Sequence, residues 1–309
     1  MKLLSIIIPC YNEAENIADF FNVLKKYQDF FNEQKIELEA LFIDDGSTDD
    51  TLAAIKALKA TDERVRFLSF SRNFGKEAAI FAGLTAAKGD YLVFMDADLQ
   101  DPPALLPEML GHILAGYDSV ATRRISRKGE PKIRSFFARR FYRIMKRFSK
   151  VDIVDGARDY RLITRQMADA LLSMGEYNRF TKGIFAWVGF KTKWLEYENI
   201  ERAKGETKWS FWRLFAYSLE GIAAFSTAPL ALASFVGLLF CLVAFIFIII
   251  IIVRALVYGD PTSGWPSLVC VILLVSGIQL FCIGIIGQYL AKTYMEVKKR
   301  PIYLLKEEG

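Results

Sequence analysis

The chain has 309 residues and a formal net charge of +5, and 53% of its residues are hydrophobic. Its mean hydropathy of +0.22 is high for a soluble protein. The length allows one soluble domain of ordinary size plus a smaller part. The four cysteines have no metal or disulfide spacing, which excludes a disulfide framework and fits a reducing cytosol. We interpret the single histidine, His112, as a packing or surface residue rather than a catalytic one.

The N-terminal part of the chain alternates between predicted strands and helices. The first apolar run is too short for a signal peptide and lacks a small-residue cleavage site, so we interpret it as a strand. Helices are predicted after Asn12, which can act as a cap, and after the acidic cluster at 44–49. The other predicted helices cover 76–87 and 103–115, and predicted strands cover 3–8, 37–43, 65–70, 91–95 and 119–122. This alternation predicts an α/β fold with a doubly wound, mostly parallel sheet.

Carboxylates follow the strands at the ends where such sheets bind ligands. Asp96 and Asp98 come directly after the strand at 91–95, and both can face one hard divalent cation through oxygen ligands. Alternatively, they form a turn or cap a helix, since Pro102 and Pro103 predict a helix start just beyond.

The chain has neither a glycine-rich dinucleotide loop nor a lysine-bearing P-loop. Because carboxylates stand where phosphate-binding amides would be needed, a phosphate requires a cation in between. The pattern therefore indicates a nucleoside diphosphate held through Mg²⁺ or Mn²⁺. Asp44 and Asp45 would then bind the base, uracil, and the ribose of this nucleotide. Alternatively, they only cap the next helix.

Four motifs together resemble family 2 glycosyltransferases: PCYNEAENI, FIDDGSTDDT, SRNFGKEAAIFAGL and DADLQDPP. They resemble the branch that transfers one sugar from a nucleotide donor to a polyprenyl phosphate, such as bactoprenol glucosyltransferases and dolichol-phosphate mannose synthases. Later segments, among them FTKGIFAWVGF and RAKGETKWSFWRL, extend the resemblance over nearly the whole chain. It implies a nucleotide-sugar-binding domain of the GT-A type and an inverting transfer.

The resemblance also implies roles for individual residues. The metal ligands would be Asp96, Asp98 and Gln100. The nucleotide-sugar site would contain Pro9, Tyr11, Glu13, Asp44, Asp45, Arg72, Lys76, Asp96, Arg202 and Lys208. From the residues alone, Arg72 and Lys76 could equally be a solvated basic pair, and the segment of Arg202 and Lys208 could serve as a membrane anchor.

The catalytic candidates are Asp98, Asp155 and Asp159. Asp155 and Asp159 are candidates for a general base. Of these two, Asp159 aligns better with the Gly-Asp-Phe-Arg-Leu segment of related bacterial enzymes. A phosphate monoester is already largely dianionic at neutral pH, so this aspartate could instead position the acceptor or the sugar.

Residues 123–150 contain twelve lysines or arginines and one acid, interleaved with aromatic and aliphatic residues. The pattern predicts an amphipathic helix with a basic face, which suits an anionic membrane surface. Arg123 and Arg134 are candidates for binding the acceptor phosphate, because arginine offers a forked pair of donors. Nucleic-acid binding could use the same composition, but the acidic strand ends and the membrane segments disfavour it.

No charged residue occurs in 221–253 or in 261–291. Each stretch is long enough to cross a bilayer, so we predict transmembrane helices near 228–253 and 266–291. Buried helices of a soluble core are the alternative, which the absence of a polar face in 246–253 disfavours. The predicted organisation is a cytoplasmic glycosyltransferase domain (1–205), an interfacial helix (206–227), a two-helix transmembrane hairpin (228–291) and a cytoplasmic basic tail (292–309).

Several lysines and arginines precede the first span and follow the second, whereas the connecting turn holds only Arg254 and Asp260 as charged residues. The catalytic domain and both termini are therefore predicted to be cytoplasmic, at the inner membrane of a bacterium. Gly277, Gly284 and Gly287 permit close helix packing and favour a homo-oligomer, with a tetramer as one form. The expected partners are a UDP-sugar, undecaprenyl phosphate and membrane lipids, with a flippase and a second glycosyltransferase acting downstream.

The resulting hypothesis is a metal-dependent enzyme that transfers one hexose, glucose first among the choices, from a UDP-sugar to undecaprenyl phosphate. Alternative donors are UDP-N-acetylglucosamine and a UDP-4-amino-arabinose derivative. A processive polysaccharide synthase is the rival within the same fold, but its Gln-x-x-Arg-Trp motif is absent from the chain. A non-catalytic membrane adaptor that binds lipid phosphates is the rival of a different class.

Overall fold

The computed structural model describes residues 1–124, 154, 156–197, 228–258 and 264–309. Its centre is an eight-stranded sheet with the order β7-β5-β6-β4-β1-β2-β3-β8. The strands are β1 (Lys2–Cys10), β2 (Ile36–Asp44), β3 (Val65–Phe70), β4 (Tyr91–Phe94), β5 (Ser119–Arg124), β6 (Ala157–Thr164), β7 (Thr192–Tyr197) and β8 (Leu305–Glu308). The predicted α/β fold with a mostly parallel sheet is confirmed, and the five predicted strands correspond to β1–β5.

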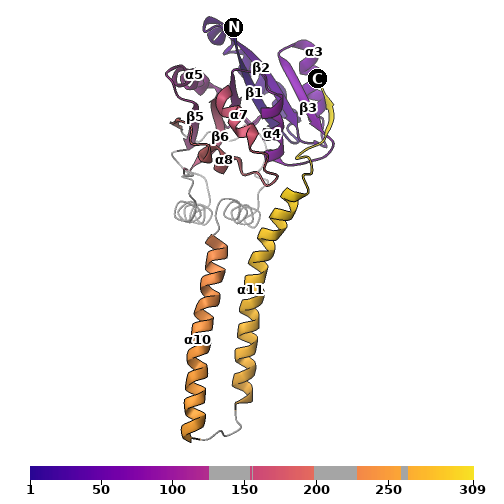
Figure 1. The fold of residues 1–309 in the computed structure, drawn as a ribbon. Coiled ribbons are helices and arrows are strands. Elements are labelled where there is room, and N and C mark those ends of the chain that lie inside the picture. Colours follow the sequence, from indigo (N-terminus) through magenta and orange to yellow (C-terminus); the bar gives the residue numbers. More distant parts are fainter. Residues whose placement is uncertain (125–153, 155, 198–227, 259–263) are drawn as a thin grey trace.

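Helices cover both faces of the sheet (Figure 1). Those of the domain are α1 (Ala14–Lys25), α2 (Gln28–Glu33), α3 (Thr51–Thr61), α4 (Lys76–Ala86), a 3₁₀ turn η1 (Pro103–Leu105), α5 (Leu106–Leu114), α7 (Arg165–Ser173) and α8 (Thr181–Trp187). Side chains of β1 alternate between two cores: Ile6 and Ile8 pack with α1 and α5, whereas Ile7 packs with α4, α7 and α8. The alternation follows from the two-residue period of a strand that is buried on both faces.

The strand order changes direction next to β1. The chain runs from β1 to β2 and β3 on one side and then returns to place β4, also parallel, on the other side of β1. The carboxyl ends of β1 and β4 therefore flank the point where doubly wound sheets bind ligands.

Beyond β4 the sheet becomes mixed. Strand β6 runs antiparallel to β4, and Phe94 pairs with Arg161. Because antiparallel partners run in opposite directions, the residues that follow β4 lie opposite those that begin β6. This register brings the segment after Phe94 and the segment before Arg161 to the same edge.

The predicted cap at Asn12 is wrong. Glu13 is the N-cap residue of α1, and its side chain makes no capping hydrogen bond. Asn12 instead adopts a left-handed backbone with a φ of 56°, and its side-chain oxygen accepts a hydrogen bond from the Thr48 amide at 2.8 Å. Asparagine tolerates that conformation well, so Asn12 joins the loop after β1 to the loop after β2.

The C-terminal segment returns to the domain. Strand β8 lies antiparallel to β3 at the edge of the sheet, and Lys56 and Glu307 form an ion pair of 2.7 Å. Just before β8, the ring of Tyr303 stacks on Phe70 with a centroid distance of 4.9 Å. The end of the predicted basic tail is thus part of the sheet, which the sequence reading did not foresee.

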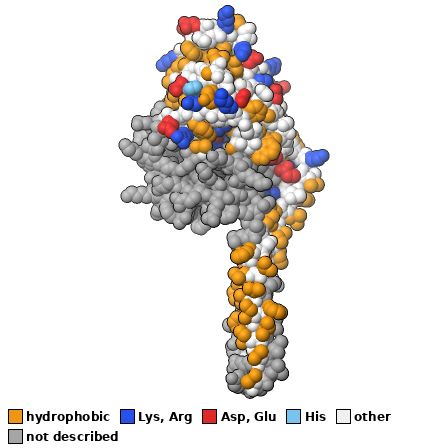
Figure 2. Space-filling view, turned by 60° about the vertical axis from the view of Figure 1, so that its left-hand side comes forward, with side chains coloured by type: hydrophobic (Ala, Val, Ile, Leu, Met, Phe, Trp, Pro, Cys, Tyr) orange, Lys and Arg blue, Asp and Glu red, His pale blue; other side chains and the backbone are white. Residues whose placement is uncertain are grey.

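Two long helices, α10 (Ala228–Tyr258) and α11 (Trp265–Val297), project together from the domain (Figure 1). They contact each other, for example where the Cys282 thiol donates to the Ala233 carbonyl at 3.6 Å. Hydrophobic side chains cover the described part of this stalk, whereas charged side chains gather on the domain (Figure 2). Within the described residues, one segment, Leu274–Val297, is long and apolar enough to cross a membrane.

The contact of α4 with β1 provides a test of the packing. A Cβ on Gly83 would lie 2.2 Å from Cγ2 of Ile7, a fully buried side chain, so we expect Gly83→Ala to destabilise the domain by about 1–3 kcal/mol. Thermal unfolding in detergent measures the effect. Gly111→Ala is the matched control, because that glycine lies inside α5 with open space around its Cβ position and should gain up to about 1 kcal/mol. Equal behaviour of the two variants would contradict the close packing.

Candidate active site

The loop after β4 carries the predicted metal-binding carboxylates, Asp96 and Asp98. The ammonium group of Lys76, the first residue of α4, donates to both carboxylate oxygens of Asp96 at 2.7 and 2.9 Å. Asp98 turns back on its own loop and accepts the Gln100 amide at 3.1 Å. Leu99 between them has a φ of 55°, which turns the chain sharply at this point.

Asp159, near the start of β6, lies beside this group, as the pairing of β4 with β6 requires. Its carboxylate is 2.8 Å from the Lys76 ammonium and 3.8 Å from that of Lys182 in α8. Lys76 therefore bridges Asp96 and Asp159. The sequence predicted Lys76 for the donor site but did not predict Lys182. The one indication for Lys182 was its place in the FTKGIFAWVGF segment.

The charges of this cluster stabilise one another. Desolvation opposes the charge on Lys76, but the carboxylates of Asp159 and Asp96 outweigh it and raise the pKa of Lys76 above its ordinary value. Desolvation likewise opposes ionisation of Asp159, yet Lys76 and Lys182 hold the pKa of Asp159 well below its ordinary range. Both groups are thus charged at neutral pH, and Asp159 is a weak proton acceptor in this arrangement.

Asp44 ends β2, Asp45 follows it, and both are buried. Asp44 accepts hydrogen bonds from the Ser69 hydroxyl at 2.7 Å and the Ser47 amide at 3.0 Å. Asp45 accepts the amides of Phe74 and Gly75 at 2.6 and 2.9 Å, which ties the end of β2 to the loop after β3. Burial raises the pKa of Asp45 to about 6, although these amides favour its charged form.

Gly46 explains the turn that follows these two aspartates. Its φ is +63°, and a Cβ there would lie 2.3 Å from the carbonyl carbon of Arg72. Only glycine meets both demands, so the Asp-Asp-Gly sequence lets the β2 and β3 loops touch.

The first predicted donor loop, after β1, is held by its neighbours. The Glu13 amide donates to the Thr51 hydroxyl at 2.8 Å, and the Glu13 carboxylate accepts from the Asn16 side chain at 2.6 Å. Pro9 is half-buried and Tyr11 is 39% exposed, so the tyrosine ring is available to a ligand at this edge.

A second buried charge pair supports the loop after β4. Asp101 accepts the Tyr197 hydroxyl at 2.9 Å and lies 3.5 Å from Nε of Arg158, and Arg158 also reaches the Gln100 side-chain oxygen at 3.3 Å. Burial raises the pKa of Asp101, while Arg158 opposes that shift. The group joins the loop after β4 to β6 and β7. Sequence reasoning missed it, and membership of the DADLQDPP and GARDYRL segments was the only signal.

The other predicted residues divide into two sets. Arg72 stacks on the ring of Phe74 at 4.5 Å, and Arg123, at the end of β5, forms an ion pair with Glu196 of β7. The remaining predicted site residues lie outside the described residues: Arg134, Asp155, Arg202 and Lys208.

The carboxylate oxygens of Asp96 and Asp98 fit a divalent cation whose other ligands come from a bound molecule. The Lys76 ammonium on both oxygens of Asp96 shows that this carboxylate faces a position suited to positive charge. In the described part of the chain, no three histidine, cysteine, aspartate or glutamate side chains gather as a complete metal cage. Mg²⁺ and similar ions are commonly bound through one or two carboxylates plus substrate phosphates and water, so Asp96 and Asp98 suffice.

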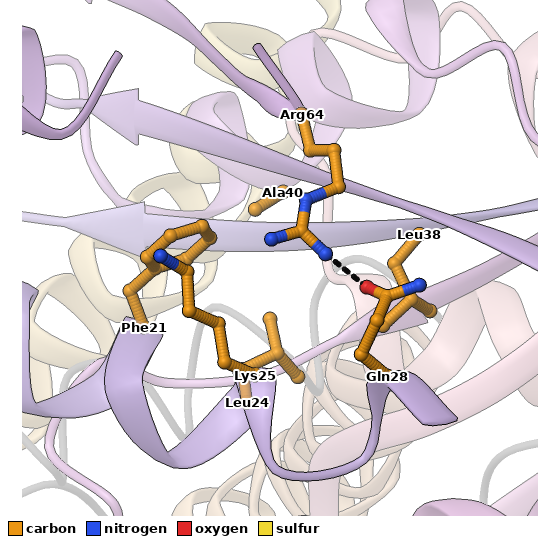
Figure 3. Close-up of a pocket in the computed structure, with 7 residues that line it drawn as sticks. All are labelled: Phe21, Leu24, Lys25, Gln28, Leu38, Ala40 and Arg64. Carbon is orange, nitrogen blue, oxygen red and sulfur yellow. Dashed lines mark hydrogen bonds between the residues drawn. The ribbon is translucent and has the colours of Figure 1, made fainter. Parts of the chain in front are cut away.

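A pocket lies elsewhere, between α1, α2 and β2 (Figure 3). In it, the Arg64 guanidinium donates to the side-chain oxygen of Gln28 beside Leu38 and Ala40 of β2. These strand residues precede Asp44 by four or more positions, so the pocket is away from the carboxyl edge of the sheet. Its lining residues also include no carboxylate, unlike those of the candidate site.

The fold is a GT-A-like α/β fold with a mixed, mostly parallel sheet whose ligand edge carries carboxylates. Residues 5–172 match the family described as glycosyl transferase family 2, and the chain belongs to this family. It is therefore a glycosyltransferase.

Relatives match over nearly the full length. The chain is 45% identical to the glycosyltransferase CsbB of Bacillus subtilis, covering 99% of this chain and 92% of that protein. It is 40% identical to the prophage bactoprenol glucosyl transferase homolog of Escherichia coli, covering 98% of each. Among solved structures, glucosyl-3-phosphoglycerate synthase of Mycobacterium tuberculosis is 21% identical with a TM-score of 0.47, covering 72% of this chain and 78% of that one.

The raised pKa of Asp45 predicts a pH-dependent stability. Its folded-state value of about 6 lies above the ordinary 3.8, so the folded state holds this proton more tightly than the unfolded chain does. Its contribution to stability is full below pH 3.8 and is lost as pH rises through 6, a change of at most about 3 kcal/mol. Asp45→Asn should therefore gain stability relative to wild type between pH 4.5 and pH 7.5 in unfolding experiments. The exposed Asp169→Asn serves as control, and a wild-type-to-variant difference independent of pH would contradict the assignment.

Proposed function

We propose that the protein transfers a single glucose from UDP-glucose to a polyprenyl phosphate at the cytoplasmic face of a bacterial membrane, with inversion at the anomeric carbon. The observation that carries this proposal is the cluster in which Lys76 bridges Asp96 and Asp159 at the ligand edge. The full-length relatives named bactoprenol glucosyl transferase support the choice of sugar and of acceptor. Undecaprenyl phosphate is the acceptor that we infer.

In the proposed reaction, Asp44 and Asp45 bind the uracil and ribose of the donor, with Pro9, Tyr11 and Glu13 on the neighbouring loop. Asp96 and Asp98, with Gln100, would hold Mg²⁺ or Mn²⁺, which when bound supplies positive charge to the diphosphate. The acceptor phosphate oxygen bonds to the anomeric carbon while the bond to the donor's β-phosphate oxygen breaks, and UDP leaves with that electron pair. Lys76, which is charged at neutral pH, stabilises the developing charge on UDP.

Asp159 is proposed to position the acceptor rather than to remove a proton. Its low pKa makes it a poor base, and a phosphate monoester is largely dianionic at neutral pH. Arg123 and Arg134, with Arg202 and Lys208 from the later basic segment, would offset the charges of the two substrates. Asp155 and Asp98 remain alternative catalytic carboxylates.

We further propose that α10 and α11 form a two-span hairpin in the inner membrane, next to the lipid acceptor. Their apolar surfaces and the basic residues at both outer ends support this topology. A homo-oligomer, such as a tetramer, is proposed from the glycines of α11. The lipid-linked product would then need a flippase and a second glycosyltransferase.

Transfer to lipid tests the function. Purified protein with undecaprenyl phosphate and Mg²⁺ or Mn²⁺ should form a single-sugar lipid from labelled UDP-glucose. Asp96→Ala should reduce turnover at least about 100-fold, because it removes a proposed ligand of the cation that supplies positive charge to the diphosphate. Asp169→Asn, an exposed carboxylate of α7, should leave turnover unchanged. If product forms only from UDP-N-acetylglucosamine or only from a UDP-4-amino-arabinose derivative, that sugar replaces glucose in the proposal. Long polymer would favour a processive synthase, and lipid binding without product would favour a non-catalytic adaptor.

Cysteine labelling tests the topology. In a chain whose four native cysteines are replaced by serine, Ser263→Cys between the two helices should react with a membrane-impermeant maleimide in intact spheroplasts. Lys299→Cys, just after α11, should react only once the membrane is opened. Reaction of both positions in intact spheroplasts would rule out the proposed hairpin.

A further inference from the structure

The last turn of α11 makes an unusual contact with the catalytic domain. The Glu296 carboxylate accepts hydrogen bonds from the backbone amides of Tyr177 and Asn178, each at 3.0 Å, and from the Asn178 side chain at 3.2 Å. The same Asn178 amide group also donates to the Lys292 carbonyl at 3.4 Å. These contacts attach the loop between α7 and α8 to a helix more than 100 residues later in the chain.

The position of Glu296 along α11 allows its carboxylate to remain charged. The apolar segment Leu274–Val297 has 24 residues, about 36 Å of helix, whereas a bilayer core is only about 30 Å thick. The last turn therefore extends into the headgroup region, where a carboxylate remains ionised at lower cost than in the core. Hydrogen bonds to a charged acceptor are stronger than neutral ones, and they satisfy two backbone amides of the loop.

The loop leads directly into the active site. Thr181, the first residue of α8, donates from its amide to the Glu77 carboxylate at 2.9 Å, and its hydroxyl also donates to that carboxylate. Lys182, the next residue, lies 3.8 Å from Asp159. Glu77 is the neighbour of Lys76, which contacts Asp159 at 2.8 Å. Only four positions separate Asn178 at the membrane helix from Lys182 at the catalytic cluster.

We propose that Glu296 is a positioning residue: by holding Tyr177 and Asn178, it fixes the start of α8, and with it Lys182 and Asp159, at a set height relative to the membrane helix. This inference rests on the proposed function, because its role is to align the cluster with the phosphate of an acceptor that is confined to the bilayer. A phosphate presented from the membrane has a fixed depth, so a small displacement of the cluster costs turnover. An acceptor free in solution has no such restriction.

Glu296→Gln tests the proposal with little change of shape. We expect kcat/KM for undecaprenyl phosphate in nanodiscs to fall at least about tenfold. For a short, water-soluble polyprenyl phosphate the fall should be less than about twofold, and the Kd for UDP should not change, because the donor loops are not touched. Asn178→Ala should show the same selectivity more weakly, since the two backbone amides still reach Glu296. Thr293→Ala is the matched control, because this position is exposed on the same helix and its hydroxyl donates to the Tyr289 carbonyl one turn earlier.

Amide hydrogen exchange gives a second measurement that does not depend on turnover. Glu296→Gln should speed exchange at Tyr177 and Asn178 at least about tenfold, while β1 and β4 keep their protection. Equal loss of activity with both acceptors would overturn the proposal in favour of a purely structural role, and so would unchanged activity with both. If wild type transfers no sugar, the proposed function fails, and the contact is then judged on exchange alone, where unchanged protection at Tyr177 and Asn178 overturns it.

Discussion

Asp96 and Asp159 carry like charges at one edge of the sheet, and the ammonium group of Lys76 lies within hydrogen-bonding distance of both. Without that cation, the two carboxylates would repel each other. Because Lys76 is the first residue of α4, its position is fixed by the packing of that helix on the sheet. The arrangement of the site therefore depends on how α4 lies against β1.

The strand order explains why these groups come from distant parts of the chain. The return from β3 to β4 across β1 creates the switch point at which doubly wound sheets bind ligands, and the reversal into β6 brings Asp159 opposite the residues after Phe94. The same edge receives Asp44 and Asp45 from β2. The charged side chains of the site thus lie at the ends of strands, and the strand order determines which of these ends come together.

The sequence predicted what is local and periodic. Strands β1–β5 follow from apolar runs, and Asp44, Asp45, Asp96 and Asp98 follow from their places after those runs. Partners that pairing creates were not predictable: Lys182 beside Asp159, Arg158 with Asp101, and β8 beside β3 depend on contacts across more than 20 residues. Asn12 shows that a local signal can also give a wrong prediction, because a residue that suits a helix cap serves equally well in a left-handed turn.

Helix α4 also links the site to α11. Its first turn provides Lys76 and Glu77 to the cluster, and one turn later Phe81 contacts Tyr303, which follows α11, and the Arg179 guanidinium in the loop that Glu296 holds. Since Gly83 of α4 sits directly on Ile7 of β1, the helix has little room to shift. A displacement of α11 would therefore reach Asp96 and Asp159 through one closely packed helix, which is the coupling that the proposed transfer to a membrane-bound acceptor would require.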